Sequence, residues 1–224
     1  MVCLCVIPAK RGTAQVDENQ PGAWYMYFFS SSFGQGPWGV QGDVQYRNFD
    51  MGGDLEQLLV RGGLTYRLDR LNALLTLGYG NITTGTFGGS SDTTHEDRLY
   101  QELLLPYRIG ERFLFRHRLR LEQRWVDDQD FRTRFRYAMF LDVPLNQTSL
   151  SAGAVYLALY DEIFINGERD IGSGRSVNSY DRNRAYAALG YSLTDSLRVQ
   201  AGYMHQHSKN VKKGQFQLSL HHSF

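Results

Sequence analysis

The feature that most constrains this chain is an alternation of apolar and charged residues, clearest between residues 112 and 125 (RFLFRHRLRLEQRW). One parity of this segment is apolar and carries Phe113, Phe115, Leu119, Leu121 and Trp125. The other parity is charged and carries Arg112, Arg116, Arg118, Arg120, Glu122 and Arg124. Successive side chains of a β-strand point to opposite faces, so this period of two predicts a strand with one apolar and one charged face.

The same period recurs from residue 23 to the end of the chain and predicts an all-β protein. The expected strands cover residues 23–32, 38–49, 55–68, 72–84, 95–109, 112–126, 130–143, 148–163, 179–193, 196–208 and 214–224. Most of them are longer than the ~5–6 residues usual in soluble proteins. They match the ~9–11 residues that a tilted membrane strand needs.

The expected connections between these strands alternate in length. Short ones lie at 67–70, 109–112, 144–147 and 193–196, and longer ones, rich in Gly, Ser and Asp, lie at 84–94, 126–130, 164–178 and 208–213. Short periplasmic turns and longer outer loops are typical of outer-membrane barrels, so we expect a single antiparallel transmembrane β-barrel. Bacterial single-chain barrels have even strand numbers, which favours twelve strands, or ten, over the eleven visible segments. Residues 15–22 would then supply a further strand or thread the lumen.

A soluble sandwich or barrel with its charged face in water shows the same alternation, so the pattern alone leaves that alternative open. Three features favour the bacterial outer membrane and its lipid. Few charges interrupt the apolar parity, and Tyr and Trp gather near strand ends, as in an interfacial aromatic girdle. The last segment, LSLHHSF, ends on Phe224, which resembles the C-terminal signal read by the outer-membrane assembly machinery.

The first residues of the chain differ from the rest. Residues 2–9 are apolar and precede Lys10 and Arg11, so residues 1–14 are interpreted as a signal-peptide remnant or disordered leader, and residues 15–224 as the barrel domain. Both cysteines lie in this leader, which excludes a disulfide framework or a thiolate metal site in the barrel. No run approaches the ~18 apolar residues of a membrane helix. The net charge of +1 argues against a nucleic-acid partner.

Several stretches resemble a family of bacterial outer-membrane proteins catalogued as domain of unknown function 2490. They are the strand at Trp24, the hairpin from LTYRL (64–68) into LLTLGYG (74–80), the Arg-rich hairpin 112–136, YDEIFING (160–167) and DRNRAYAALGY (181–191). The resemblance spans nearly the whole chain after residue 23. It implies a membrane barrel without an established activity, and it transfers no catalytic residue.

Arginine dominates the charged parity. The arginines expected to face inward are Arg98, Arg116, Arg118, Arg120, Arg124, Arg132, Arg134, Arg136, Arg182 and Arg184. A charge facing lipid at mid-membrane costs about 2–4 kcal/mol, so these side chains are expected in the lumen. Neighbouring guanidinium groups repel one another unless carboxylates lie between them. The expected partners are Glu102, Glu122 and Glu162, with Asp161 as a further candidate. Either this network fills and plugs the lumen, or the excess of arginine draws in or binds anions.

The other motifs point to no defined chemistry. Asp161 and Glu162 are adjacent on a strand, so they point to opposite faces and do not converge for acid–base catalysis or Ca²⁺ binding. His205 and His207 share a face at a spacing that suits a metal, but no third ligand is evident. No GxSxG motif occurs, and the glycine-rich segment 78–89 begins no helix. We therefore predict no catalytic residue, no metal site and no cofactor.

Three functional hypotheses follow. The first is a small outer-membrane barrel of structural, channel or accessory type, whose open form would be an anion-selective or anion-binding pore. The second is a membrane-embedded hydrolase that modifies lipids. The third is a partner subunit whose outer strands contact a larger envelope protein complex.

Overall fold

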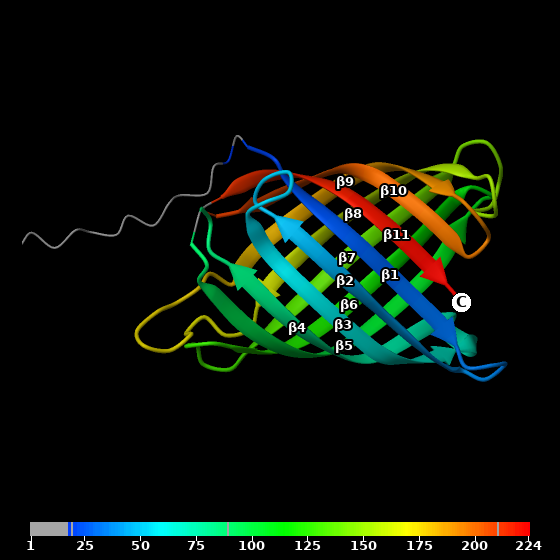
Figure 1. The fold of residues 1–224 in the computed structure, drawn as a ribbon. Helices are drawn as coiled ribbons and strands as arrows, with labels where there is room; N and C mark the ends of the chain where they lie inside the picture. Colours follow the sequence, from blue (N-terminus) through cyan, green and yellow to red (C-terminus); the bar gives the residue numbers. More distant parts are fainter. Residues whose placement is uncertain (1–17, 19, 89, 210) are drawn as a thin grey trace, which may run out of the picture.

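A closed β-barrel accounts for most of the chain in this computed structural model (Figure 1). The structure describes residues 18, 20–88, 90–209 and 211–224. The elements are β1 (Gly22–Ser32), β2 (Trp38–Asn48), β3 (Leu55–Leu68), the short 3-10 helix η1 (Asp69–Leu71), β4 (Ala73–Gly85), β5 (Thr93–Ile109), β6 (Phe113–Val126), β7 (Arg132–Pro144), β8 (Val155–Asn166), β9 (Tyr180–Ser192), β10 (Leu197–Ser208) and β11 (Lys212–Ser223). Within the described residues, no helix is long and apolar enough to cross a membrane.

The barrel closes between its first and last strands. Neighbouring strands are antiparallel except at this closure, where β1 and β11 run parallel, with Ala23 beside Phe216 and Phe29 beside His222. An odd number of strands with alternating directions leaves the first and last pointing the same way, so eleven strands can close only through one parallel pair. The described residues therefore form neither the twelve strands expected nor the ten of the alternative. The leader at 1–14 lies outside the described residues, as do residues 15–17 and 19 of the segment 15–22.

The observed strands follow the period-two pattern closely, with one exception. Ten of the expected strands begin and end within two residues of the observed bounds, but β8 begins at Val155 and not at residue 148. The short turn expected at 144–147 is instead a longer loop. In it the Asn146 side chain accepts a hydrogen bond from the Val155 amide and donates one to the Gly153 carbonyl. Polar side chains that bind nearby backbone in this way replace the bonds of a strand ladder.

The two faces of the barrel wall differ in chemistry. Large apolar side chains remain exposed on the outer face, such as Leu77 at 56% and Leu189 at 61% exposed. The buried side chains, in contrast, include ten basic and six acidic ones. Apolar side chains therefore point away from the barrel axis, and charged side chains point toward it.

Aromatic rings lie on the outer face toward both ends of the barrel. Trp38 packs edge-on against Tyr66 at one end, with 4.8 Å between ring centroids, and Trp125 packs against a neighbouring ring at the other end. His117 belongs to the same outer face, which explains why it shares a parity with apolar residues. It shares a hydrogen bond of 2.8 Å with the Tyr137 hydroxyl and stacks on a tyrosine of β5 at 5.3 Å.

Apolar rings and small residues pack the part of the interior that the charged side chains do not fill. This buried cluster comprises Trp24, Tyr156, Ala158, Tyr186, Ala188 and Met204. Glycines make room for two interior rings, because a Cβ atom would lie 2.2 Å from the Tyr156 ring at Gly190 and 2.2 Å from the Tyr100 ring at Gly78. Side chains thus occupy much of the interior.

Candidate functional site

The strand registers bring arginines of β5, β6 and β7 together inside the barrel. Arg124 of β6 lies beside both Arg98 of β5 and Arg132 of β7. Like charges directly opposite each other destabilise a strand pair. Two residues before Arg124 on the same face of β6, Glu122 lies opposite Arg134 of β7. Repulsion along the strands is therefore offset by carboxylates that alternate with the arginines.

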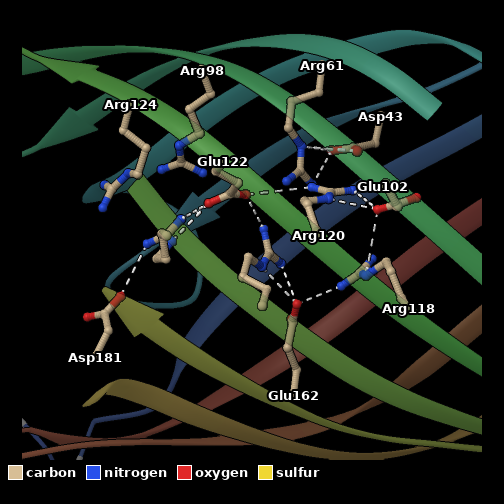
Figure 2. A network of polar contacts seen from close by, with 12 residues as sticks. Asp43, Arg61, Arg98, Glu102, Arg118, Arg120, Glu122, Arg124, Glu162 and Asp181 are labelled. Carbon is tan, nitrogen blue, oxygen red and sulfur yellow. Dashed lines mark hydrogen bonds and ion pairs between the residues drawn. The ribbon is translucent and has the colours of Figure 1, made fainter. Parts of the chain in front are cut away.

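Glu122 is the centre of the resulting network (Figure 2). Its carboxylate accepts from Arg134 Nη2 at 2.6 Å and from Arg136 Nη1 at 2.7 Å, and Arg120 lies 3.8 Å away. The Glu122 residue is fully buried at 0% exposed. A single carboxylate thus holds three guanidinium groups from two strands.

Two further glutamates extend the network across the interior. Glu162 of β8 accepts from Arg136 at 2.6 Å and from Arg118 at 2.7 Å. Glu102 of β5 pairs with Arg120 at 2.5 Å. A continuous chain of ion pairs therefore runs along the inner face of four neighbouring strands, from β5 to β8 (Figure 2).

Sequence reasoning missed several members of this network. Glu96 accepts from both Arg98 and Arg124 at 2.5 Å. The other missed pairs are Asp43 with Arg61 at 2.9 Å, Asp142 with Arg116 at 2.8 Å, and Asp181 with Arg134 and with Arg182 at 3.2 Å each. Glu96 lies two residues before Arg98 and therefore on the same face of the strand. The alternating pattern that identified the inward-facing arginines could also have identified Glu96.

The ten arginines predicted from the sequence all lie on the inner side of the wall. Seven of them are buried, and Arg116, Arg118 and Arg182 are partly exposed. Glu102, Glu122 and Glu162, the carboxylates expected beside them, are buried as well. Asp161, the further candidate, lies exposed on the outer face instead, where it accepts a hydrogen bond from the Asn183 side chain at 2.9 Å.

Three buried arginines have no carboxylate within ion-pair distance in the described part of the chain: Arg47, Arg132 and Arg184. Arg47 donates to the side-chain oxygens of Gln45 and Gln57. Arg184 donates through Nε to Gln206 at 2.8 Å. Both guanidinium groups also lie over the Trp24 ring, at 3.8 and 4.8 Å from its centroid. Neutral amides and an aromatic face therefore stand where the other arginines have a carboxylate.

A cavity of about 250 Å³ lies within the barrel beside the ion-pair network. Basic groups on its wall include Arg47, Arg118 and Arg184, and aromatic rings include Trp24 and Tyr160. Six arginines and three carboxylates line the cavity, so its wall carries a net positive charge and suits an anion better than a cation.

The ion-pair network gives the barrel rigidity more than net stability. Desolvating two charges costs several kcal/mol per ion, and their mutual attraction roughly offsets that cost. Removing one partner of a buried pair costs about 3–5 kcal/mol, because it leaves an uncompensated charge. The network therefore fixes one arrangement of the interior side chains and penalises the loss of any member.

One serine–histidine contact lines the same cavity. Ser219 Oγ lies 3.0 Å from His221 Nε2 on β11, and the imidazole stacks on Phe28 at 4.8 Å. Nucleophilic catalysis also needs a third group that orients the histidine. In the described residues no side chain bonds the other imidazole nitrogen, so the pair lacks that group. His205 and His207 lie on the outer face of β10, and the structure groups no three metal-ligating side chains among its described residues.

The fold and its interior define a class: a closed β-barrel with an apolar outer face and arginine–carboxylate pairs inside. A family model described as "Protein of unknown function (DUF2490)" matches residues 21–217. The chain therefore belongs to this family, as the sequence motifs indicated. No curated protein and no solved structure matches the chain.

Proposed function

We propose that this chain is an outer-membrane β-barrel that crosses the bilayer with a plugged, arginine-rich lumen. The observation that carries the proposal is the inversion of the usual burial pattern. Leucine, phenylalanine and tyrosine side chains are exposed around the whole wall, whereas six carboxylates and ten basic groups are buried. Soluble monomers rarely expose contiguous apolar patches of more than a few hundred Å².

The strands are long enough to cross a bilayer. β4 has 13 residues, and at ~3.3 Å per residue it extends about 40 Å. With the 35–45° tilt of membrane barrels, it rises about 28–33 Å along the barrel axis. The apolar band of an outer-membrane barrel is about 25 Å tall, so the strand covers it with some overhang.

The ion pairs support a plugged lumen and not an open pore. They join the inner faces of the neighbouring strands β5, β6, β7 and β8, and a hydrogen bond from Gln41 of β2 to Glu102 of β5 ties the network to a more distant strand. Separating buried charges at 2.5–2.7 Å carries the desolvation cost of breaking a pair. We propose a structural or accessory role for the barrel in the membrane.

Planar-bilayer recording tests the plugged state. The purified barrel should insert, as checked by protease protection in vesicles, and then show no steady conductance up to strong voltage. Regular steps that favour anions would contradict the plug and would support the pore form of the proposal.

A charge placed on the outer face tests the membrane assignment. Leu77 lies midway along β4 and is 56% exposed, whereas Thr83 lies on the same face near the end of the strand. Leu77→Arg should lower the unfolding free energy in lipid vesicles by about 2–4 kcal/mol, and Thr83→Arg by about 0–1 kcal/mol. Urea titration followed by tryptophan fluorescence measures both. Equal effects of the two substitutions would show that the face does not meet hydrocarbon.

A further inference from the structure

Two chemically different kinds of side chain line the interior cavity. The rings of Trp24, Phe28, Phe140 and Tyr160 come from β1, β7 and β8. Guanidinium groups lie among these rings, and those of Arg118 and Arg136 are already joined to Glu162. A molecule inside would therefore meet flat apolar surface and cationic groups at once.

The Trp24 ring carries two guanidinium groups that have no carboxylate within ion-pair distance among the described residues, although Glu162 lies opposite Arg184 in the β8–β9 register. Arg47 lies 3.8 Å and Arg184 lies 4.8 Å from the ring centroid. Every nitrogen of the Arg47 guanidinium already donates to a glutamine side chain. Arg184 donates only through Nε among the described residues, which leaves its two terminal nitrogens for a ligand. Cation–π contacts and neutral hydrogen bonds do not cancel a buried charge, so an anion from outside would complete the site.

A second, independent observation points to a missing partner. The Tyr186 residue is 6% exposed, it lines the cavity, and its hydroxyl has no hydrogen-bond partner in the described structure. The Nε atom of Arg118, which also lines the cavity, is buried without a hydrogen-bond acceptor, and its ion-pair partner Glu102 lies 3.8 Å away. Buried polar groups in native proteins are nearly always hydrogen-bonded, so these unused donors mark a place for an acceptor.

We propose that this cavity is a binding site for a small organic carboxylate with a flat, apolar body. The planar carboxylate would accept from the terminal nitrogens of Arg184 and from the Tyr186 hydroxyl, and the body would lie against Trp24 and Tyr160. Guanidinium and carboxylate groups match in geometry because both are planar and can form two parallel hydrogen bonds. The volume of about 250 Å³ corresponds to roughly eight water molecules at ~30 Å³ each, enough for a single aromatic ring with its carboxylate.

The binding site does not depend on the membrane proposal, because binding can be measured on the folded barrel in detergent. Trp24 is the natural reporter, and the other two tryptophans of the chain, Trp38 and Trp125, lie exposed on the outer face. In the variant Trp38→Phe/Trp125→Phe, fluorescence comes from Trp24 alone. Titration with sodium benzoate should change this fluorescence saturably at micromolar to low millimolar concentration.

Two other probes define the ligand class. Benzamide has the same flat body without the charge, and inorganic phosphate has the charge without the flat body. Both should bind at least tenfold more weakly than benzoate. Absence of saturable benzoate binding, or equal binding of benzamide, would overturn the proposal. If phosphate binds with the same affinity as benzoate, the cavity is a simple anion site that does not recognise a flat apolar body, and the proposal is overturned as well.

Substitutions separate binding from folding. Tyr186→Phe removes a hydroxyl that has no partner in the free protein, so it should leave the thermal stability unchanged or higher while weakening benzoate binding severalfold. Arg184→Gln should weaken binding at least tenfold. Arg132→Gln is the matched control, because Arg132 is also buried without a carboxylate partner but does not line the cavity. Unchanged affinity in Tyr186→Phe, or equal loss in Arg132→Gln and Arg184→Gln, would contradict the site.

Discussion

Replacing Glu122 by glutamine tests whether the ion-pair network holds the barrel interior together. The glutamine amide keeps the shape of the side chain but loses its charge, so Arg134 at 2.6 Å and Arg136 at 2.7 Å lose the carboxylate between them. Glu122 is fully buried, and water cannot screen the remaining charges. Removal of one partner of a buried pair costs about 3–5 kcal/mol. At 1.4 kcal/mol per factor of ten, the unfolding equilibrium constant should rise roughly 10²–10³-fold or more.

The measurement is equilibrium unfolding in urea, in detergent micelles or lipid vesicles, followed by tryptophan fluorescence. Glu111→Gln serves as the control, because Glu111 is exposed in the turn between β5 and β6 and should change the unfolding free energy by less than about 0.5 kcal/mol. The double variant Glu122→Gln/Arg134→Met should recover part of the loss, since it also removes one of the uncompensated charges. If Glu122→Gln costs no more than Glu111→Gln, or if the double variant loses the full sum, the network does not act as described.

Three further predictions concern other parts of the barrel. Arg134→Gln, which breaks a buried pair, should lower the unfolding free energy by several kcal/mol more than Arg132→Gln in the same urea assay, and equal effects would contradict the pairing. Gly78→Ala should reduce the folded yield and the unfolding temperature, because the added Cβ would lie 2.2 Å from an interior ring, and an unchanged melting temperature would refute the close contact. A hydrogen bond from the backbone amide of Thr133 lowers the pKa of the Glu168 carboxyl from its usual value of 4.5. This hydrogen bond is therefore fully formed above pH 4.5 and is lost as the pH falls through the lowered pKa. Hydrogen exchange should show that protection of the Thr133 amide falls as the pH drops through this acidic range, and that the fall does not occur in Glu168→Gln. Protection that does not depend on pH in the unmodified chain would contradict the role of Glu168.

The sequence predicts the strands and faces well because a period of two is a local property. An isolated strand already shows which residues share a face, and this places Arg120 and Glu122 together before any fold is known. The period of two did not predict that β8 starts at Val155. The loop before it is held by hydrogen bonds between the Asn146 side chain and backbone groups of Gly153 and Val155, which the alternation of residues does not reveal. Side-chain competition of this kind overrides a weak local pattern.

The ion-pair partners depend on register, which a single sequence does not contain. Parity predicts that Glu162 and Arg136 face the same interior, but only the pairing of β7 with β8 brings their atoms within 2.6 Å. The strand number was missed for a different reason. The period of two marks eleven segments, but the even strand numbers of bacterial barrels favoured twelve, and the closure of β1 on β11 as a parallel pair departs from that rule.

The parallel seam between β1 and β11 has a topological consequence. In a barrel with an even strand number, the first strand begins on the same side of the bilayer where the last strand ends. Here β1 begins at one rim and β11 ends at the opposite rim. In the bilayer-spanning state proposed above, epitopes placed just before Gly22 and just after Ser223 would be labelled from opposite sides of a sealed vesicle. Two antibodies and an impermeant reagent would then show that the strand number is odd.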